Sequence, residues 1–598
     1  MFPKFLTACA TGLLMAFSAG PVLACGGFFC VRVPVDQAGE RVVFAVDGEE
    51  VTAIVQVQYQ GPAEQFAWVI PVPTEPKVGV GSEALFARLA AATRPTYRLE
   101  VSTTGSCKTE SRGFFGFGGA TATSVALADM APRIAEGVTI VSQGVVGPYE
   151  TATLKSDDPE ALVTWLRENG YQIPDSLDPL LAPYIRSKHY FVALRLQKDR
   201  TTGDLQPITL KMREAYPCVP IRLTAVAATP NMPITLWVFG EGRAIPRNYR
   251  HVHLNEALID WQGATPLALT SPQAPFAAPA PNYDAVVSQA IAEAGGNGWV
   301  TEKAGPTSAL GLNLDPGLDK ARLLSSPGPR DLAFAMTRAG LPGSAVQGLL
   351  RRHLPLPADL AAQGWTESQY WAWYGFTTTG NGVAAGPAIS PWNDQGRPGE
   401  PSPMPGGFSV SAFVEDLDAI YITPMREAAG LIRRNPVMTR FYTTMSPEQM
   451  TEDPTFSFHT NMAGTASDHK ARGERLCSDS VTFGEAPIRV TLENGQAFTL
   501  TNARPVVPLG TMPAAARIER LFEEGDAELI VDNLAKIADA LKTISGVVQS
   551  QPGCGCSNPA QTAGMPDAGG EEAALAAGAW GSLVWWRGRR RSRKQDLG

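Results

Sequence analysis

Two histidines one residue apart are the side chains in this sequence best suited to chemistry. His251 and His253 flank Val252. Because alternate side chains of a β-strand point to the same face, both imidazole rings would lie on one side of a strand. Imidazole nitrogens are common zinc ligands, so the pair could be half of a metal site, which Glu256 or Asp260 could complete. The alternative is a surface pair, or a pair held by hydrogen bonds within a sheet.

The remaining motifs do not indicate a reaction. The sequence has no H-E-x-x-H zinc-protease motif, no G-x-S-x-G nucleophile motif and no P-loop. Glu448, Glu452 and Asp453 could provide a carboxylate pair, although such a cluster is more typical of a solvated helix start. We therefore assign no catalytic residue and expect no cofactor.

A dense group of aromatic residues in the second half of the chain could stack on sugars or bind a partner. Tyr370 and Tyr374 have the spacing of one helix face, which favours a place in the hydrophobic core. The group consists of Trp365, Tyr370, Trp371, Trp373, Tyr374 and Phe376.

The first 24 residues have the pattern of a secretory signal peptide. Lys4 supplies the basic n-region, residues 5–17 form the apolar h-region, and Val22-Leu23-Ala24 resembles a small-residue cleavage site. Cleavage after Ala24 would make Cys25 the first residue. The same residues also form a loose lipobox in which Cys25 would be acylated, but we favour plain cleavage. Both interpretations predict export.

The cysteines fit an oxidising compartment, where they would form disulfides. Cys25 and Cys30 are close enough in sequence to close a small loop, and Cys218 and Cys477 could join the two halves of the chain. Sequence alone does not fix the connectivity. The cysteines that remain after loss of the leader are Cys25, Cys30, Cys107, Cys218, Cys477, Cys554 and Cys556. Because their number is odd, one thiol is expected to be lipidated, free or paired with another molecule.

The C-terminal tail has the layout of a membrane anchor. Cys554 and Cys556 precede an uncharged apolar stretch over residues 573–586 that ends in Trp585 and Trp586. The basic residues that follow include Arg589, Arg590 and Arg591. A basic block after an apolar stretch is typical of a membrane anchor whose basic end stays in the cytoplasm. The apolar stretch is, however, shorter than the ~20 residues that cross a bilayer. The alternative is an alanine-rich tail with a basic end.

Composition and periodicity predict an α+β fold: a β-rich antiparallel N-terminal domain with embedded helices, then a more helical second half with a late β-hairpin. With 598 residues, the chain can hold several domains. The net charge of −8 argues against nucleic-acid binding. The expected segments are a signal peptide (1–24), the β-rich domain (25–263), a linker (264–281), a mainly helical region (282–377), a Gly/Pro-rich segment (378–407), an α+β region (408–550), a cysteine-containing spacer (551–572) and the apolar, arginine-rich tail (573–598).

Local patterns predict the individual elements. Alternation over residues 51–59 predicts an antiparallel strand, and Pro71 and Pro73 place the next strand at a sheet edge. Ser82 is expected to cap a helix. Strands of one sheet are expected at 190–196, 208–212, 219–227 and 234–239, and a hairpin at 488–492 and 497–500. Helical structure is expected at 283–294, over 331–374, over 421–442 apart from Pro424 and Pro436, and over 514–544 with an interruption near Gly525.

A set of stretches spread along the chain carries a family resemblance: ACGGFFC (24–30), VTAIVQVQYQGPAEQFAWVIPVP (51–73), VGPYETATLKSDDPEALVTWLRENGY (146–171), PCVPIRLTAV (217–226), NEALIDW (255–261), NYDAVVSQAIAEAGG with VTEKAG (282–305) and TRFYTTMSPEQMTEDPTFSFH (439–459). As a set they resemble the exported bacterial family called domain of unknown function 2330. The resemblance implies a secreted or membrane-attached protein and transfers no catalytic residue. The tail is similar to a myxobacterial sorting signal, which combines a cysteine, a hydrophobic segment and an arginine cluster.

Together these patterns predict an exported cell-envelope or surface protein with a binding or structural role and without enzymatic activity. We expect it to bind an envelope or extracellular partner and to attach to the membrane through its tail, with no role in nucleic-acid binding. The alternatives are a secreted hydrolase with an unrecognised active site, or a metal-binding module that uses His251 and His253.

Overall fold

A computed structural model describes most of the chain between residues 36 and 549. The leader, Cys25, Cys30 and the whole C-terminal tail lie outside the described residues, as do most of the predicted linker and of the Gly/Pro-rich segment. Among the described residues, no helix combines the length and the apolar character that a membrane-spanning helix requires. The described residues are 36–60, 66–108, 137–171, 177–197, 200, 204–264, 280–336, 343–376 and 401–549.

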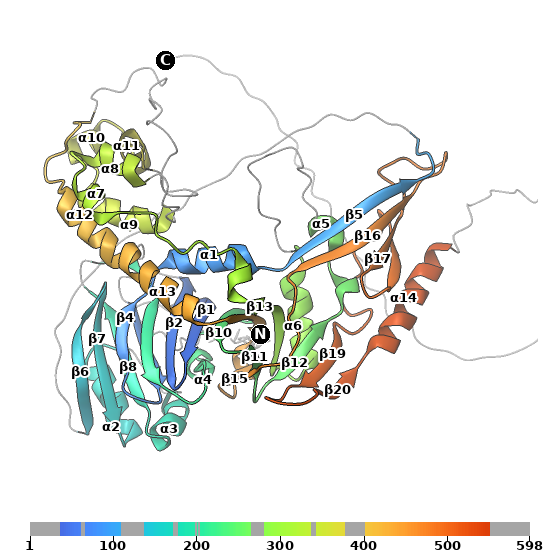
Figure 1. The fold of residues 1–598 in the computed structure, drawn as a ribbon, viewed down its shortest axis with the longest axis horizontal. Coiled ribbons are helices and arrows are strands. Elements are labelled where there is room, and N and C mark those ends of the chain that lie inside the picture. The colour runs from blue at the N-terminus through green and yellow to red at the C-terminus, as the bar shows by residue number, and fades with distance from the viewer. Residues whose placement is uncertain are drawn as a thin grey trace, which may run out of the picture. The chain divides into compact units, whose positions relative to one another are not determined.

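A mixed sheet of ten strands brings together segments from most of the sequence (Figure 1). Neighbouring strands are antiparallel except for the parallel pairs β1–β10 and β12–β13. In spatial order the strands are β20 (Glu528–Asp532), β19 (Ala515–Arg520), β12 (Arg250–Leu254), β13 (Gly298–Pro306), β14 (Val437–Met445), β10 (Met232–Gly240), β1 (Asp36–Asp47), β2 (Glu50–Gln60), β9 (Ile208–Arg213) and β4 (Lys77–Val80).

A second sheet of four strands packs against one end of the first. Val42 and Val55 of the large sheet share a core with Trp68 and Val192 of the smaller one, so the two sheets form a sandwich. The predicted edge position of the proline-containing strand is confirmed, because β3 is the outer strand. The order is β3 (Ala67–Val72), β8 (Tyr190–Leu196), β7 (Tyr149–Ser156) and β6 (Val138–Val146), with helices α2 (Pro159–Glu168) and α3 (Asp178–Arg186) on the outer face.

A helical layer forms the largest hydrophobic core. Ser82 caps α1, as predicted, by accepting a hydrogen bond from the backbone of Ala84. All six aromatic residues from Trp365 to Phe376 are buried, which confirms the core interpretation. The elements are α1 (Glu83–Thr93), η5 (Thr307–Leu310), α7 (Lys320–Leu324), α8 (Pro329–Met336), α9 (Gly343–His353), α10 (Ala358–Ala362), α11 (Glu367–Tyr374), α12 (Val410–Leu417), η6 (Asp418–Ile422) and α13 (Thr423–Arg434).

A third, four-stranded sheet contains the only disulfide among the described residues. It joins Cys107 to Cys477 at the ends of β5 and β16, whereas Cys218 has a free thiol. The possible Cys218–Cys477 pairing is therefore wrong. The predicted hairpin is confirmed, with Gly495 at φ +82° in its turn. The strands are β18 (Ala497–Leu500), β17 (Ile488–Leu492), β16 (Asp468–Leu476) and β5 (Thr96–Thr104).

The remaining elements connect these layers. A two-stranded ribbon, β11 with β15, contacts the large sheet, and α6 begins and ends close to the predicted positions. The elements are β11 (Arg243–Pro246), β15 (Phe456–His459), α4 (Ile221–Thr224), η4 (Glu256–Leu258), α5 (Trp261–Ala264), α6 (Tyr283–Glu293), η7 (Pro447–Gln449) and α14 (Leu534–Gln549).

The α+β class is confirmed, but four local predictions are wrong. The predicted strand at 219–227 is the short helix α4, and β8 lies in a different sheet from β9 and β10. The chain is helical only as far as Arg434, after which Pro436 precedes central strand β14. The helices predicted over 514–544, with an interruption near Gly525, are instead strands β19 and β20 followed by α14. Tertiary pairing overrides local helix propensity there.

Candidate metal centre

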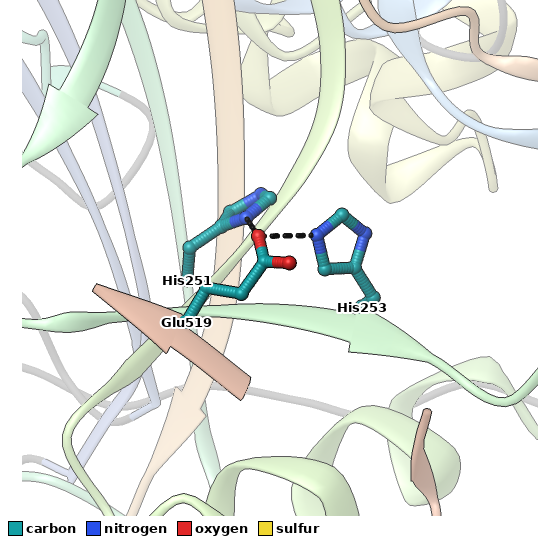
Figure 2. Close-up of side chains that lie close together, drawn as sticks. All are labelled: His251, His253 and Glu519. Atoms are coloured by element: carbon teal, nitrogen blue, oxygen red, sulfur yellow. Dashed lines mark hydrogen bonds and ion pairs between the residues drawn. The ribbon is translucent and has the colours of Figure 1, made fainter. Parts of the chain in front are cut away.

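Two adjacent strands place two histidines and a glutamate on one face of the large sheet (Figure 2). His251 of β12 lies directly opposite Glu519 of β19 in the antiparallel register. His253 follows two residues later, so it points to the same face as His251. The alternate residues Val252 and Ile518 point to the other face and are buried in a hydrophobic core. This apolar face fixes the register, and the register brings the three polar side chains together.

The three side chains are close enough to share one ion. One ligand atom from each of His251, His253 and Glu519 lies within 4.8 Å of the others. Nε2 of His253 is 3.0 Å from Oε2 of Glu519, and Nδ1 of His251 is 3.7 Å from the same oxygen. The His251 side chain is 5% exposed, whereas that of His253 is 47% exposed. The cluster is therefore anchored in the sheet and reachable from solvent.

The His251 ring has an unsatisfied nitrogen. Its Nδ1 is buried and has no hydrogen-bond partner among the described residues, since 3.7 Å to Glu519 is too long for one. Burial lowers the pKa of His251 to about 4. The His251 ring, whose Nδ1 faces Oε2 of Glu519, and then the His253 ring, at hydrogen-bond distance from the same oxygen, hold the pKa of the Glu519 carboxyl well below its usual range. At neutral pH, His251 is thus a neutral imidazole and Glu519 a carboxylate, the protonation states that bind metals.

Arg243 is a nearby positive charge that would disfavour binding of a metal ion. It lies on β11, which contacts β12 and β13, and its guanidinium donates to the carbonyl of Ala463 at 2.5 Å. Burial lowers the pKa of Arg243, and the charge of Glu519 partly opposes this. A cation here would repel a metal ion and weaken its binding.

The sequence identified two of the three residues and missed the third. The shared strand face of His251 and His253 is as predicted. Neither suggested third ligand joins them, however. Glu256 forms an ion pair with His469 at 2.9 Å, and Asp260 accepts a hydrogen bond from the backbone of Gly263 at 2.8 Å. Glu519 is 266 residues from His253 in sequence, so only strand pairing reveals it.

The acidic residues Glu448, Glu452 and Asp453 do not form a carboxylate pair. Asp453 instead accepts hydrogen bonds from the Tyr184 hydroxyl at 2.6 Å and from the backbone N–H of Arg222 at 3.0 Å. These bonds tie the loop before β15 to α3 and α4. Asp453 is therefore engaged in holding the fold.

A cavity between the two packed sheets collects several titratable groups. Its lining is largely apolar and includes Tyr184, His189, Glu214, Cys218 and Asp453. Burial raises the pKa of Glu214 to about 8 and also raises the pKa of Cys218 and Asp453. A nucleophilic cysteine needs a lowered pKa, so this arrangement does not favour Cys218 as a nucleophile.

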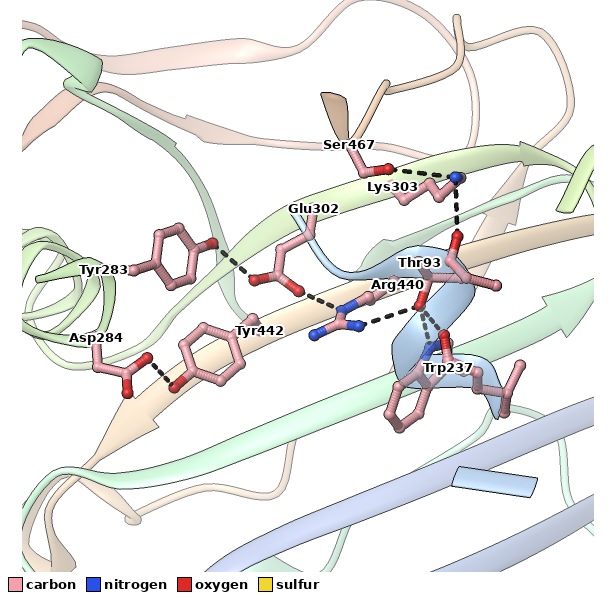
Figure 3. A network of polar contacts seen from close by, with 11 residues as sticks. Thr93, Trp237, Tyr283, Asp284, Glu302, Lys303, Arg440, Tyr442 and Ser467 are labelled. Carbon is pink, nitrogen blue, oxygen red and sulfur yellow. Dashed lines mark hydrogen bonds and ion pairs between the residues drawn. The ribbon is translucent and has the colours of Figure 1, made fainter. Parts of the chain in front are cut away.

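A buried polar network joins the large sheet to α1 and α6 (Figure 3). Arg440 forms a buried ion pair with Glu302, whose other oxygen accepts from the Tyr283 hydroxyl at 2.7 Å. Thr93 accepts from Arg440 and from the indole of Trp237, and its own hydroxyl donates to the Leu89 carbonyl. Further bonds join Lys303 to Ser467 and Tyr442 to Asp284.

Comparison with known proteins gives one match. Residues 21–301 match the family described as "Uncharacterized protein conserved in bacteria (DUF2330)". The match supports assigning this part of the chain to that domain family. It includes His251 and His253, whereas Glu519 lies beyond it. Searches of curated proteins and of solved structures found no match to the chain.

Proposed function

We propose that this protein is an exported cell-envelope or surface protein that binds a divalent transition metal at His251, His253 and Glu519. Binding, rather than catalysis, is its function in this proposal. The observation that carries the metal assignment is the convergence of these three side chains on one point of the sheet. Two imidazoles and a carboxylate form a donor set that zinc accepts, with one coordination position left for water or another ligand.

The protonation states favour the metal over a simple ion pair. A free imidazole lone pair and a deprotonated carboxylate are needed for coordination. The unpartnered nitrogen of His251 is also costly in the metal-free protein, because a buried polar atom without a hydrogen bond costs about 1–3 kcal/mol. A bound cation would satisfy it.

Titration of the purified protein with Zn²⁺ tests this proposal. We expect one equivalent of zinc to bind, and His253→Ala or Glu519→Gln to weaken binding by about 10–100-fold or more. Arg243→Gln should strengthen binding because it removes a neighbouring positive charge. Glu256→Gln is the matched control, since it disrupts another histidine–carboxylate pair and should leave zinc binding unchanged. Equal affinity in all variants would refute the site.

Export and attachment rest on the leader-like and tail sequences. The disulfide between Cys107 and Cys477 supports this proposal, because such bonds persist in oxidising compartments. Fractionation of cells that make the intact chain, or a chain ending at Pro552, tests the attachment. We expect truncation to release the protein, with Cys25 unmodified by mass spectrometry. Retention of the truncated chain with an acyl group on Cys25 would instead establish a lipoprotein.

A further inference from the structure

A groove beside the end of helix α2 is a second, independent candidate for binding. It has a volume of about 370 Å³ and lies on the second sheet, formed by β3, β8, β7 and β6. Its residues are far in sequence from β19. In the strand register, Val145 of β6, Glu150 of β7 and Arg195 of β8 form one row across the sheet. The next row, which contains the small residue Ala152, faces the same side. Helix α2 covers this face only in part, and the groove lies at its C-terminal end.

The polar groups at the base of the groove are held in place and carry no net charge. Nε of Arg195 donates to Oε2 of Glu150 at 2.7 Å, and a second guanidinium nitrogen is 2.5 Å from the same oxygen. Arg195 also donates to the carbonyl of Asn169 at the end of α2, at 3.4 Å. Both ion-pair contacts use one oxygen of Glu150. The other groove residues are uncharged, so the lining suits a neutral ligand.

The wall of the groove contains a buried donor without an acceptor. Trp165 is 3% exposed, and its indole nitrogen has no hydrogen-bond partner among the described residues. Its ring lies beside that of Tyr171, with the ring centroids 6.2 Å apart. Burial raises the pKa of the Tyr171 hydroxyl, so it stays protonated. The residues of the wall therefore carry two donors beside Asn169, whose amide nitrogen already donates one hydrogen to the Trp165 carbonyl at 2.8 Å and keeps the other.

From these contacts we infer that the groove binds a neutral polyhydroxylated ligand of about one or two sugar rings. Hydroxyl groups both donate and accept hydrogen bonds, so they match the indole N–H, the amides and the unoccupied oxygen of Glu150 together. A volume of about 370 Å³ is at the small end of the range for ligand pockets. A lone anion would find its guanidinium already paired, and a lone cation would find the carboxylate already paired.

Titration with simple sugars tests this inference on the purified full chain. The probes are the methyl glycosides of glucose, galactose, mannose and N-acetylglucosamine, and a trisaccharide of N-acetylglucosamine. We expect at least one to bind, with the affinity reduced about tenfold by Glu150→Gln. Trp165→Phe, which removes the indole N–H but keeps an aromatic ring, should act in the same direction. Tighter binding of the trisaccharide than of its monosaccharide would identify a glycan chain as the source.

A matched ion pair on the ten-stranded sheet provides the control. Glu50 pairs with Lys211 at 2.6 Å, and its side chain is 42% exposed, close to the 40% of Glu150. Glu50→Gln should leave sugar affinity unchanged. Failure of every sugar to bind at millimolar concentration would overturn the inference, as would equal losses in the Glu50 and Glu150 variants. Because Zn²⁺ titration does not involve this groove, either site can fail while the other stands.

Discussion

Two polar clusters on the same large sheet differ in how completely their hydrogen bonds are satisfied. Around Arg440, each group has a partner: the guanidinium bonds to Glu302 and Thr93, and Thr93 bonds in turn to the Leu89 carbonyl. Around His251, a buried ring nitrogen has no partner and a neighbouring histidine is exposed. A satisfied buried network stabilises one arrangement of the chain, whereas an unsatisfied, accessible cluster is suited to a ligand. The first is therefore structural, and the second is our candidate site.

The largest expected effect comes from breaking the satisfied network. Arg440→Met should lower the free energy of unfolding by about 3–5 kcal/mol, because it leaves the buried carboxylate of Glu302 without its counter-ion. Chemical denaturation measures this loss. The double variant with Glu302→Gln should recover part of it. A loss below about 1 kcal/mol would show that the network is not structural in the way proposed.

Zinc should stabilise the protein only through the unsatisfied cluster. At a zinc concentration of 100 times Kd, the free energy of unfolding should rise by about 2.7 kcal/mol. Thermal unfolding with and without zinc measures this gain. Glu519→Gln should abolish it, while Arg440→Met, although less stable, should keep it. Loss of the gain in both variants would mean that the two clusters do not act separately.

Glu214 is a third kind of polar group, because its carboxyl lies in a largely apolar cavity and is kept protonated by burial. Its folded-state pKa of about 8 exceeds its ordinary value, so the folded protein retains a proton that the unfolded chain releases. Stability from this group is complete below its ordinary pKa of 4.5, falls as the pH rises from there, and is fully lost once the pH passes about 8. The whole pKa difference would correspond to about 5 kcal/mol, but Glu214 is only partly buried, so solvent screening reduces this value. Glu214→Gln should therefore stabilise the protein by about 2 kcal/mol at pH 9 and have little effect at pH 4. A stabilisation that does not depend on pH would contradict this account.

The smallest expected effect is on the metal-free candidate site. His253→Ala should change the free energy of unfolding by less than about 1 kcal/mol, because its contact with Glu519 is solvent-exposed. Chemical denaturation in the presence of a chelator measures the change. A loss comparable to that of Arg440→Met would make this cluster a second structural network.

Sequence patterns predicted the local features of the fold well where periodicity is regular. A few neighbouring residues were enough to predict three such features: the strand face shared by His251 and His253, the cap of α1 by Ser82, and the hairpin around Gly495. Such features need no knowledge of distant contacts. They place two of the three candidate ligands correctly.

The missed ligand depended on a wrongly predicted element. The segment around Glu519 is rich in Ala, Arg, Glu and Leu, which favour helices, but it forms β19 because it pairs with β12 and β20. The same limitation applies to the disulfide, since Cys107 and Cys477 meet only because β5 pairs with β16. Long-range strand pairing is what local sequence patterns do not contain.

Anomalous X-ray scattering at the zinc edge, from crystals grown with one equivalent of Zn²⁺, tests the central claim most directly. We predict one peak at about 2.0–2.2 Å from a nitrogen of His251, a nitrogen of His253 and an oxygen of Glu519. A peak at other residues, with the His253–Glu519 contact intact and no density between the three side chains, would contradict the proposed metal centre.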